Sequence, residues 1–226
     1  MAGKFFLVPT PVGNLEDLTF RALRILREVD FVLTEDTRIT TRLLQHYSIT
    51  ARMIPFHQHN EHKSLLSVIE KLQAGQNLAM VSDAGTPGIS DPGFLIVREC
   101  VKMGVDVECL PGPTAFVPAL VASGIPCDRF LFEGFLPVKK GRKSRIESLA
   151  GETRTMVFYE SPHRLVKTLT DLALVFGGDR QACVSREISK IYEEHARGSL
   201  DDLCADFSGR ATVKGEITLV VSGLIV

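Results

Sequence analysis

Short, continuous apolar runs alternate along this chain with longer segments whose apolar residues recur every three or four positions. The runs at 5–8 and 78–81 have the length and composition of strands that are buried on both faces. Residues 15–29 instead place apolar side chains on one helical stripe and leave arginines for solvent. Because strands and helices alternate, we predict a mostly parallel sheet with helices on both faces. The predicted strands of the first half cover 5–8, 31–33, 53–55, 78–81 and 105–110, and the helices cover 15–29, 38–44, 65–72 and 94–103.

The composition changes at 111–115, and an apolar helix predicted over 114–123 ends at Gly124. We place the hinge between two domains in this stretch. The predicted fold class is α/β, with two α/β lobes, residues 1–113 and 114–226, and a ligand cleft between them. In the second half the predicted strands cover 130–133, 155–159, 182–185 and 216–221, with a further antiparallel strand over 193–197, and the helices cover 142–149, 164–176 and 200–207.

The composition is that of a soluble globular protein, with 45% hydrophobic and 23% charged residues among 226. A net charge of −1 creates no global attraction to nucleic acid or membranes, so any basic surface must be local. The five cysteines are scattered and never spaced as CxxC, which favours reduced thiols in a cytosolic protein. The apolar run near the N-terminus is too short for a signal peptide or a membrane span. The GxGxxG, GxxxxGK[ST] and GxSxG motifs are absent from the sequence.

The run Val81–Gly93 joins the end of a predicted buried strand to small, acidic and turn-forming residues. Small molecules bind at the carboxyl ends of strands in α/β sheets, where glycines allow a close approach. Asp83 and Asp91 could accept hydrogen bonds from ribose hydroxyls or an amino group. An ordinary strand-to-helix connection is the alternative.

The segment Glu35–Arg38 also follows a strand, so its side chains are expected at the same edge of the sheet. Arg38 and Arg42 lie one helical turn apart and could place two cations there. A helix cap at Asp36 or Thr37 followed by a solvated basic face explains the same residues. The segment His57–His62 brings imidazoles and a carboxylate together, but no distant partner completes a zinc site, and we predict no metal.

The segment Lys139–Arg145 holds five cations within seven residues, enough for a local phosphate-binding surface. A solvated loop and helix start is the alternative. In the second half, Tyr159–Arg164 follows a strand and Lys214–Glu216 precedes one, so either segment could face a ligand or form a simple cap or turn.

Eight segments in this order resemble one family closely over essentially the whole chain. The resemblance is to the bacterial rRNA (cytidine-2′-O)-methyltransferases of the small ribosomal subunit, in the tetrapyrrole methylase superfamily of class III methyltransferases. The segments are Val8–Leu15, Glu35–Arg38, His57–Glu61, Ser82–Pro87, Leu110–Pro113, Glu133–Pro137, Phe158–Arg164 and Lys214–Glu216.

The resemblance implies a cytoplasmic homodimer that binds S-adenosyl-L-methionine between its lobes and methylates a cytidine in the decoding region of 16S rRNA, within the small ribosomal subunit. Family members often carry a further basic helical segment after the final strand. Where that segment is missing, RNA affinity is expected to depend on the 139–145 loop and the dimer surface. The donor-binding residues that it implies are Asp83, Gly85, Thr86, Pro87, Pro111, Gly112, Pro113, Thr114, Ala115, Tyr159, Arg186, Lys214, Gly215 and Glu216.

The implied reaction is in-line attack of a ribose 2′-oxygen on the sulfonium methyl group, and the hydroxyl proton needs an acceptor. Glu35, Asp36, His57 and His59 are the candidates for that base, in no fixed order. The residues predicted to bind RNA are Arg38, Arg42, Lys139, Lys140, Arg142, Lys143 and Arg145.

Two alternatives share part of this pattern. A methyltransferase acting on a corrin or another tetrapyrrole precursor would have the same donor pocket, but with a broad apolar trough in place of cationic loops. A non-catalytic RNA-binding or ribosome-assembly protein would have the cations without any need for the Asp83 loop.

Overall fold

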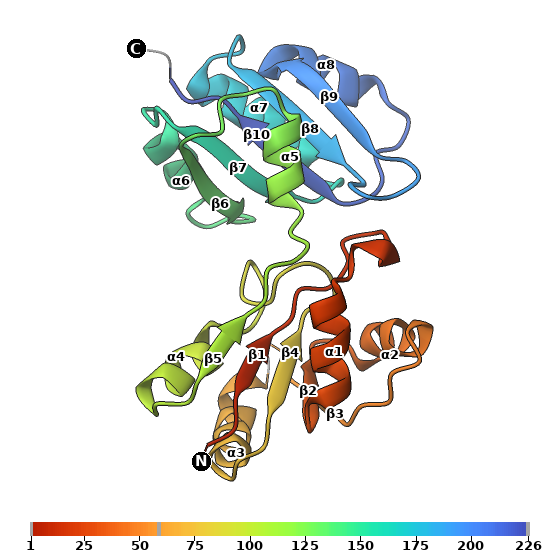
Figure 1. Cartoon of the computed structure of the whole chain (residues 1–226). Helices are drawn as coiled ribbons and strands as arrows, with labels where there is room; N and C mark the ends of the chain where they lie inside the picture. The colour runs from red at the N-terminus through yellow and green to blue at the C-terminus, as the bar shows by residue number, and fades with distance from the viewer. Residues whose placement is uncertain (1, 58–59, 225–226) are drawn as a thin grey trace. The chain divides into compact units, whose positions relative to one another are not determined.

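A computed structural model describes residues 2–57 and 60–224, and its chain divides into two compact units, 1–114 and 115–226. Each unit has its own sheet (Figure 1). Each also has its own hydrophobic core. Within the described residues of the first unit the elements are β1 Phe5–Leu7, a 3₁₀ turn at Leu15–Asp17, α1 Phe20–Glu28, β2 Phe31–Thr34, α2 Thr37–His46, β3 Met53–Pro55, α3 Glu61–Gln73, β4 Leu78–Val81, α4 Phe94–Lys102 and β5 Val107–Cys109.

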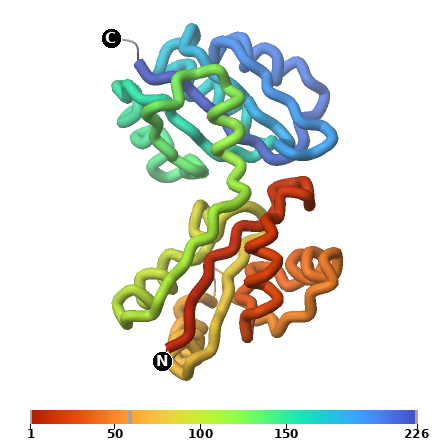
Figure 2. The backbone as a smooth tube through the Cα atoms, viewed as in Figure 1, coloured from red at the N-terminus to blue at the C-terminus, as the bar shows by residue number. Residues whose placement is uncertain are grey.

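The first sheet has the strand order β3-β2-β4-β1-β5, and every pairing in it is parallel. Figure 2 shows β1, in red, between the yellow trace of β4 and the green trace of β5. Helices α1 and α2 contribute to the core on one face, while α3 and α4 contribute to the core on the other. The predicted parallel sheet with helices on both faces is confirmed for this half of the chain.

The first helix is shorter than the 15–29 predicted from its apolar stripe. Asn14 caps the 3₁₀ turn by accepting a hydrogen bond from the Glu16 amide. Thr19 then accepts one from the Ala22 amide, so the α-helix begins at Phe20. Two successive caps therefore divide one apolar stripe into two elements.

The parallel strands bring several loops to one edge of the first sheet. The loops after β1 and β4 are joined by a two-residue bridge, in which the Thr10 and Gly85 amides each donate to the other's carbonyl at 2.9 Å. The Thr10 hydroxyl also donates to the Ser82 carbonyl at 3.0 Å. Gly85 has a φ of +81°, a conformation that favours glycine. The loop at 82–93, which we call the Gly/Asp/Pro loop, is thus fixed at its start against the segment that follows β1.

The second unit repeats the alternation of strands and helices but forms a mixed sheet. Its strand order is β6-β7-β10-β8-β9, and only β6 and β7 pair in parallel. The short loop at 187–193 joins β8 to β9 without a helix, so the chain must reverse direction there. The antiparallel strand predicted over 193–197 is confirmed as β9. The described elements are α5 Phe116–Ala122, β6 Phe130–Phe135, α6 Arg142–Leu149, β7 Thr155–Glu160, α7 Leu165–Phe176, β8 Gln181–Arg186, β9 Glu194–Ser199, α8 Leu200–Gly209 and β10 Ile217–Val221.

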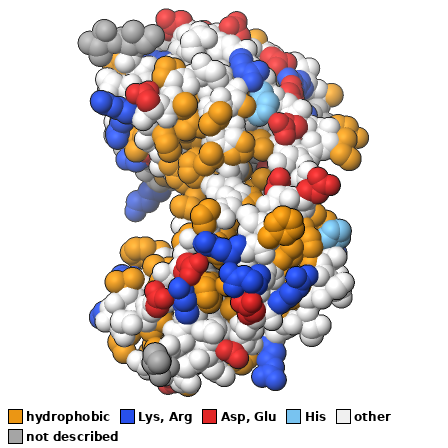
Figure 3. Space-filling view, in the orientation of Figure 1, with side chains coloured by type: hydrophobic (Ala, Val, Ile, Leu, Met, Phe, Trp, Pro, Cys, Tyr) orange, Lys and Arg blue, Asp and Glu red, His pale blue; other side chains and the backbone are white. Residues whose placement is uncertain are grey.

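The two faces of the second sheet are covered unequally. Helices α6, α7 and α8 pack on the large core of one face. Helix α5 covers the other face with a smaller cluster that includes Val157 and Val220. Val117 and Val121 of α5 stay exposed, and Figure 3 shows hydrophobic side chains around this helix. In the part of the chain that the structure describes, no helix combines the length and apolar character needed to cross a membrane.

Candidate functional site

Three carboxylates lie close to one another at the loop edge of the first sheet. Glu35 follows β2, whereas Asp83 and Asp91 belong to the loop after β4. Burial, together with the nearby negative charges of Glu35 and Asp83, raises the pKa of Asp91 to about 7. Burial, with Asp83 nearby, also raises the pKa of Glu35. The edge therefore contains one carboxyl group, that of Asp91, that can exchange a proton near neutral pH.

Replacing Asp91 with asparagine is expected to stabilise the protein near pH 8 and to change little near pH 4. In the unfolded chain an aspartate ionises near pH 4, whereas the pKa of folded Asp91 is raised to about 7. The wild-type free energy of unfolding therefore falls as the pH rises from about 4 to about 7. Asparagine removes that loss, about 2 kcal/mol once partial solvent exposure is allowed for.

Urea denaturation at a series of pH values measures this effect. Asp128→Asn, at an exposed position, is the control and should show no such pH dependence. A stability difference for Asp91→Asn that is constant from about pH 4 to pH 8 would contradict the assignment.

Asp36 is held by the helix that it caps. Its carboxylate accepts from the Arg38 amide at 2.8 Å and from the Arg38 guanidinium at 2.5 to 3.2 Å. These hydrogen bonds lower the pKa of Asp36 to about 2, and the bonds from the Arg38 side chain have the largest effect. The predicted cap is confirmed as Asp36. A carboxylate with so low a pKa is a weak proton acceptor, and Arg38 is already paired.

The Asp36 amide connects this cap to the next loop, because it donates to Asp83 Oδ1 at 3.1 Å. His57 follows β3, and its charge opposes the rise in the pKa of Glu35. His59 lies outside the described residues. Among the described residues, no group of three or more His, Cys, Asp or Glu is arranged to hold a metal ion.

The predicted donor-binding loops of the first unit contact each other. The Thr86 hydroxyl donates to the Pro113 carbonyl at 3.1 Å and lies 2.6 Å from the Thr114 hydroxyl. A Cβ at Gly112 would lie 2.7 Å from the Cβ of Pro9, so only glycine allows this approach. The loops after β1, β4 and β5 thus pack together, and Pro111 lies in the last of them. Ala115 is the residue before α5, in the second unit.

The predicted residues of the second unit also meet at the end of one sheet. The ring of Tyr159 packs at 5.2 Å from that of Phe132 and at 5.6 Å from that of Phe135. In the sheet, Ile217 pairs with Arg186, which brings Lys214–Glu216 beside the end of β8. Arg186 Nη1 donates to the Lys214 carbonyl at 3.2 Å. These residues form a second cluster of candidate ligand-binding groups.

Glu187 was not identified from the sequence, yet it holds the segment 214–216 in place. Its carboxylate accepts from the Glu216 amide at 3.0 Å and from Lys190 Nζ at 2.8 Å. Its φ is +54°, a strained value for a glutamate. Gly215, with a φ of +94°, leaves the room that this carboxylate occupies. The residue pattern contains no signal that a glutamate will adopt a left-handed backbone conformation, so the sequence could not identify Glu187.

The five cations of the segment 139–145 do not form one surface. Lys139, Lys140 and Lys143 are exposed. Arg142 is buried, and its guanidinium is bonded within the second unit at 2.9 Å to a carboxylate of α7. Arg145 makes two hydrogen bonds to Glu133, at 2.7 and 2.8 Å. The expectation that Arg142 binds RNA is corrected, because a buried guanidinium cannot reach a phosphate.

Comparison with known proteins agrees with this fold. The crystal structure of uroporphyrin-III C-methyltransferase from Thermus thermophilus, complexed with S-adenyl homocysteine, is similar with a TM-score of 0.67, 21% identity and 97% of both chains covered. The model of the tetrapyrrole (corrin/porphyrin) methylases matches residues 4–204. The chain belongs to this family of methyltransferases, as its motifs predicted.

Two relatives within the family are similar to this chain over nearly its whole length. A protein of Synechocystis sp. is 49% identical over 222 residues, covering 98% of this chain and 79% of the relative. A protein of Thermotoga maritima is 45% identical over 221 residues, covering 98% of this chain and 99% of the relative. Both are named ribosomal RNA small subunit methyltransferase I.

Proposed function

We propose that this protein transfers a methyl group from S-adenosyl-L-methionine to the 2′-oxygen of a cytidine in 16S rRNA. The observation that carries the proposal is the identity of 45–49% over nearly the whole chain to proteins named ribosomal RNA small subunit methyltransferase I. The target is within the small ribosomal subunit, and the enzyme acts in the cytoplasm as a homodimer, as the family resemblance implies.

Each of the two clusters, taken by itself, offers groups that suit this donor. S-adenosyl-L-methionine, when bound, supplies an electrophilic methyl group on a positively charged sulfur. Asp83 is a half-buried carboxylate that can accept from a hydroxyl or an ammonium group. Gly85 and Gly112 bring main-chain atoms close to the loop edge. Tyr159 and Phe135 present ring faces or edges to a flat heterocycle.

The chain must also accept the proton of the ribose hydroxyl. Glu35 suits this step better than Asp36, since burial raises the pKa of Glu35 whereas Arg38 lowers that of Asp36 to about 2. Asp91, which the sequence did not single out as a base, joins Glu35 as a candidate because its pKa is about 7. His57 remains a third candidate.

A transfer assay tests the proposal directly. Purified protein is incubated with tritiated S-adenosyl-L-methionine and small ribosomal subunits that lack the modification, and the labelled nucleotide is then mapped. We expect label on a single cytidine ribose. Label on an added tetrapyrrole precursor would support the corrin alternative, and subunit binding without any transfer would support the non-catalytic one.

Replacing Lys139, Lys140 and Lys143 together with alanine is expected to weaken subunit binding and leave donor binding unchanged. These lysines are exposed, so each can contact one phosphate. The slope of log affinity against log salt should become shallower by about 3. The binding of labelled subunits at several salt concentrations measures both quantities.

The control removes three other exposed lysines, Lys63, Lys102 and Lys167, and changes the net charge equally. It should bind subunits with the wild-type salt dependence. Equal weakening by both triple variants would mean that net charge, and not the 139–143 segment, controls binding.

A further inference from the structure

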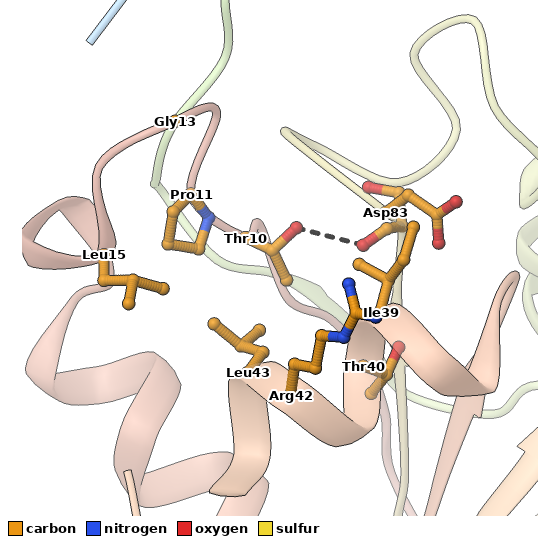
Figure 4. A pocket seen from close by; sticks show the side chains of 10 residues that line it. Thr10, Pro11, Gly13, Leu15, Ile39, Thr40, Arg42, Leu43 and Asp83 are labelled. Atoms are coloured by element: carbon orange, nitrogen blue, oxygen red, sulfur yellow. Dashed lines mark hydrogen bonds between the residues drawn. The ribbon is translucent and has the colours of Figure 1, made fainter. Parts of the chain in front are cut away.

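A pocket of about 270 Å³ lies in the first unit between the loop after β1 and helix α2. Figure 4 shows apolar side chains facing its interior from both elements, with an arginine among them. The pocket opens at the sheet edge that also holds Asp83. The lining residues are Thr10, Pro11, Gly13, Leu15, Ile39, Thr40, Arg42, Leu43, Ser82 and Asp83.

The wall on α2 is set by the helix repeat. Ile39, Arg42 and Leu43 lie three and four positions apart, so they share one face. Thr40 points into the unit, where it is buried and its hydroxyl contacts that of Thr34. The cap at Asp36 fixes where the helix starts, and hence which residues face the pocket.

The loop after β1 forms the opposite wall of the pocket, and hydrogen bonds fix this loop at both ends. The bridge between Thr10 and Gly85 fixes its beginning. At its end, the Tyr47 hydroxyl donates to the Leu15 carbonyl and so joins the loop to the end of α2. Because these contacts are within the protein, the pocket is formed before any ligand binds.

Arg42 differs from the other arginines near the candidate sites. Arg38 is paired with Asp36, and Arg145 is paired with Glu133. For Arg42 the described residues supply neither an ion pair nor a hydrogen bond, and its side chain is exposed. Its guanidinium offers five donors in one plane. A flat ligand with hydrogen-bond acceptors on its edge matches this group.

A pyrimidine base has both properties, since its faces are apolar and the edge of cytosine carries the acceptors O2 and N3. Enzymes that act on one nucleotide of a structured RNA hold it in a small pocket outside the base stack. The volume lies just below the range for drug-sized ligands, so this pocket suits one base and not a tetrapyrrole. Asp83, at its end, would place the attached ribose beside the proposed donor loops.

We propose that this pocket receives the base of the target nucleoside between Pro11, Leu15, Ile39 and Leu43, with Arg42 donating hydrogen bonds to the base edge. The assignment rests on the proposed rRNA methylation and names its substrate subsite. Arg42 is among the residues that the sequence predicts to bind RNA, and the pocket gives it a role in recognising the base.

Ile39→Trp tests the pocket by filling it. Ile39 is 40% exposed, so the larger ring need not disturb the core. We expect kcat/KM on small subunits to fall about a hundredfold, because the ribose is displaced from its position. Affinity for S-adenosyl-L-methionine, measured by calorimetry, should stay wild-type. Gln45→Trp, on an exposed position of the same helix, is the matched control and should keep wild-type activity.

Arg42→Gln separates base recognition from phosphate binding. A lost contact to the base should lower kcat/KM about tenfold and leave the salt dependence of subunit binding unchanged. A lost phosphate contact would instead reduce that salt slope by about 1 and overturn the role given to Arg42.

Three further results would each overturn the pocket assignment, the proposed function or both. Wild-type activity in Ile39→Trp would overturn the pocket assignment while leaving the proposed function intact. Loss of donor affinity in that variant would assign the pocket to the donor and also overturn the proposal. A wild-type protein that binds donor but methylates no subunit would overturn the proposed function and this subsite with it.

Discussion

Replacing Arg142 with alanine is expected to lower the free energy of unfolding by about 3 kcal/mol. The guanidinium donates to Asp171 at 2.9 Å and to the Thr168 hydroxyl at 2.8 Å. Thr168 in turn donates to the buried carboxylate of Glu160 at 2.6 Å, which also pairs with Arg164 at 2.6 Å. The alanine would leave a network of buried polar groups with one partner missing, and such groups are costly when unpaired.

Chemical denaturation of the variant and of Lys143→Ala measures the difference. Lys143 is the next residue and is exposed, so its loss should change the free energy of unfolding by less than about 0.5 kcal/mol. The folded Arg142→Ala protein should bind small subunits with the wild-type salt dependence. Weaker subunit binding with unchanged stability would restore the RNA-binding role of Arg142 that the sequence suggested.

Replacing Asp83 with alanine is expected to weaken binding of S-adenosyl-L-methionine about a hundredfold. The substitution removes a negative charge proposed to face a cationic donor, and hydrogen bonds to charged groups contribute about 1.5 to 3 kcal/mol. It also removes the acceptor of the Asp36 amide, which lies 3.1 Å from Asp83 Oδ1. The loop after β2 would then lose this hydrogen bond to the donor-binding loop.

Two further variants separate these effects in calorimetry on folded protein. Asp83→Asn keeps an oxygen for the Asp36 amide but loses the charge, so a reduction of about tenfold is expected. Asp106→Ala removes an exposed carboxylate that pairs with Lys4 just before β5, at the other edge of the sheet, and should bind donor normally. Wild-type affinity in Asp83→Ala would exclude this aspartate from the donor site.

The local patterns predicted most of the first unit because each element there is bounded by its own signals. The predicted strands at 78–81 and 53–55 match β4 and β3. Each is a short apolar run that ends at turn-forming or polar residues, and these limits are local. The cap at Asp36 was foreseen for the same reason, since an aspartate before a helix satisfies that helix's free amides.

Local patterns could not predict the order of the strands in the second sheet. The pattern identified β10 and β7 as strands, but their antiparallel pairing depends on contacts between residues about sixty positions apart, such as Thr218 and Tyr159. Glu187 was missed because a left-handed backbone at a glutamate has no composition signal. It is stabilised by its neighbours in space, Lys190 and Glu216.

The sequence alone identifies the alternation of strands and helices, the Gly/Asp/Pro loop, the run of cations and the family. Apolar spacing and motifs are local properties of a chain, so they can be read without the fold. Only the folded structure decides which charged side chains are buried or paired and which are exposed. Within one basic run, Lys143 is exposed while Arg142 is buried against Asp171. At the sheet edge, Arg38 lowers the pKa of Asp36 to about 2, while burial and nearby carboxylates raise that of Asp91 to about 7. Burial and ion pairing depend on distances between residues that are remote in the chain, and those distances exist only once the units have packed.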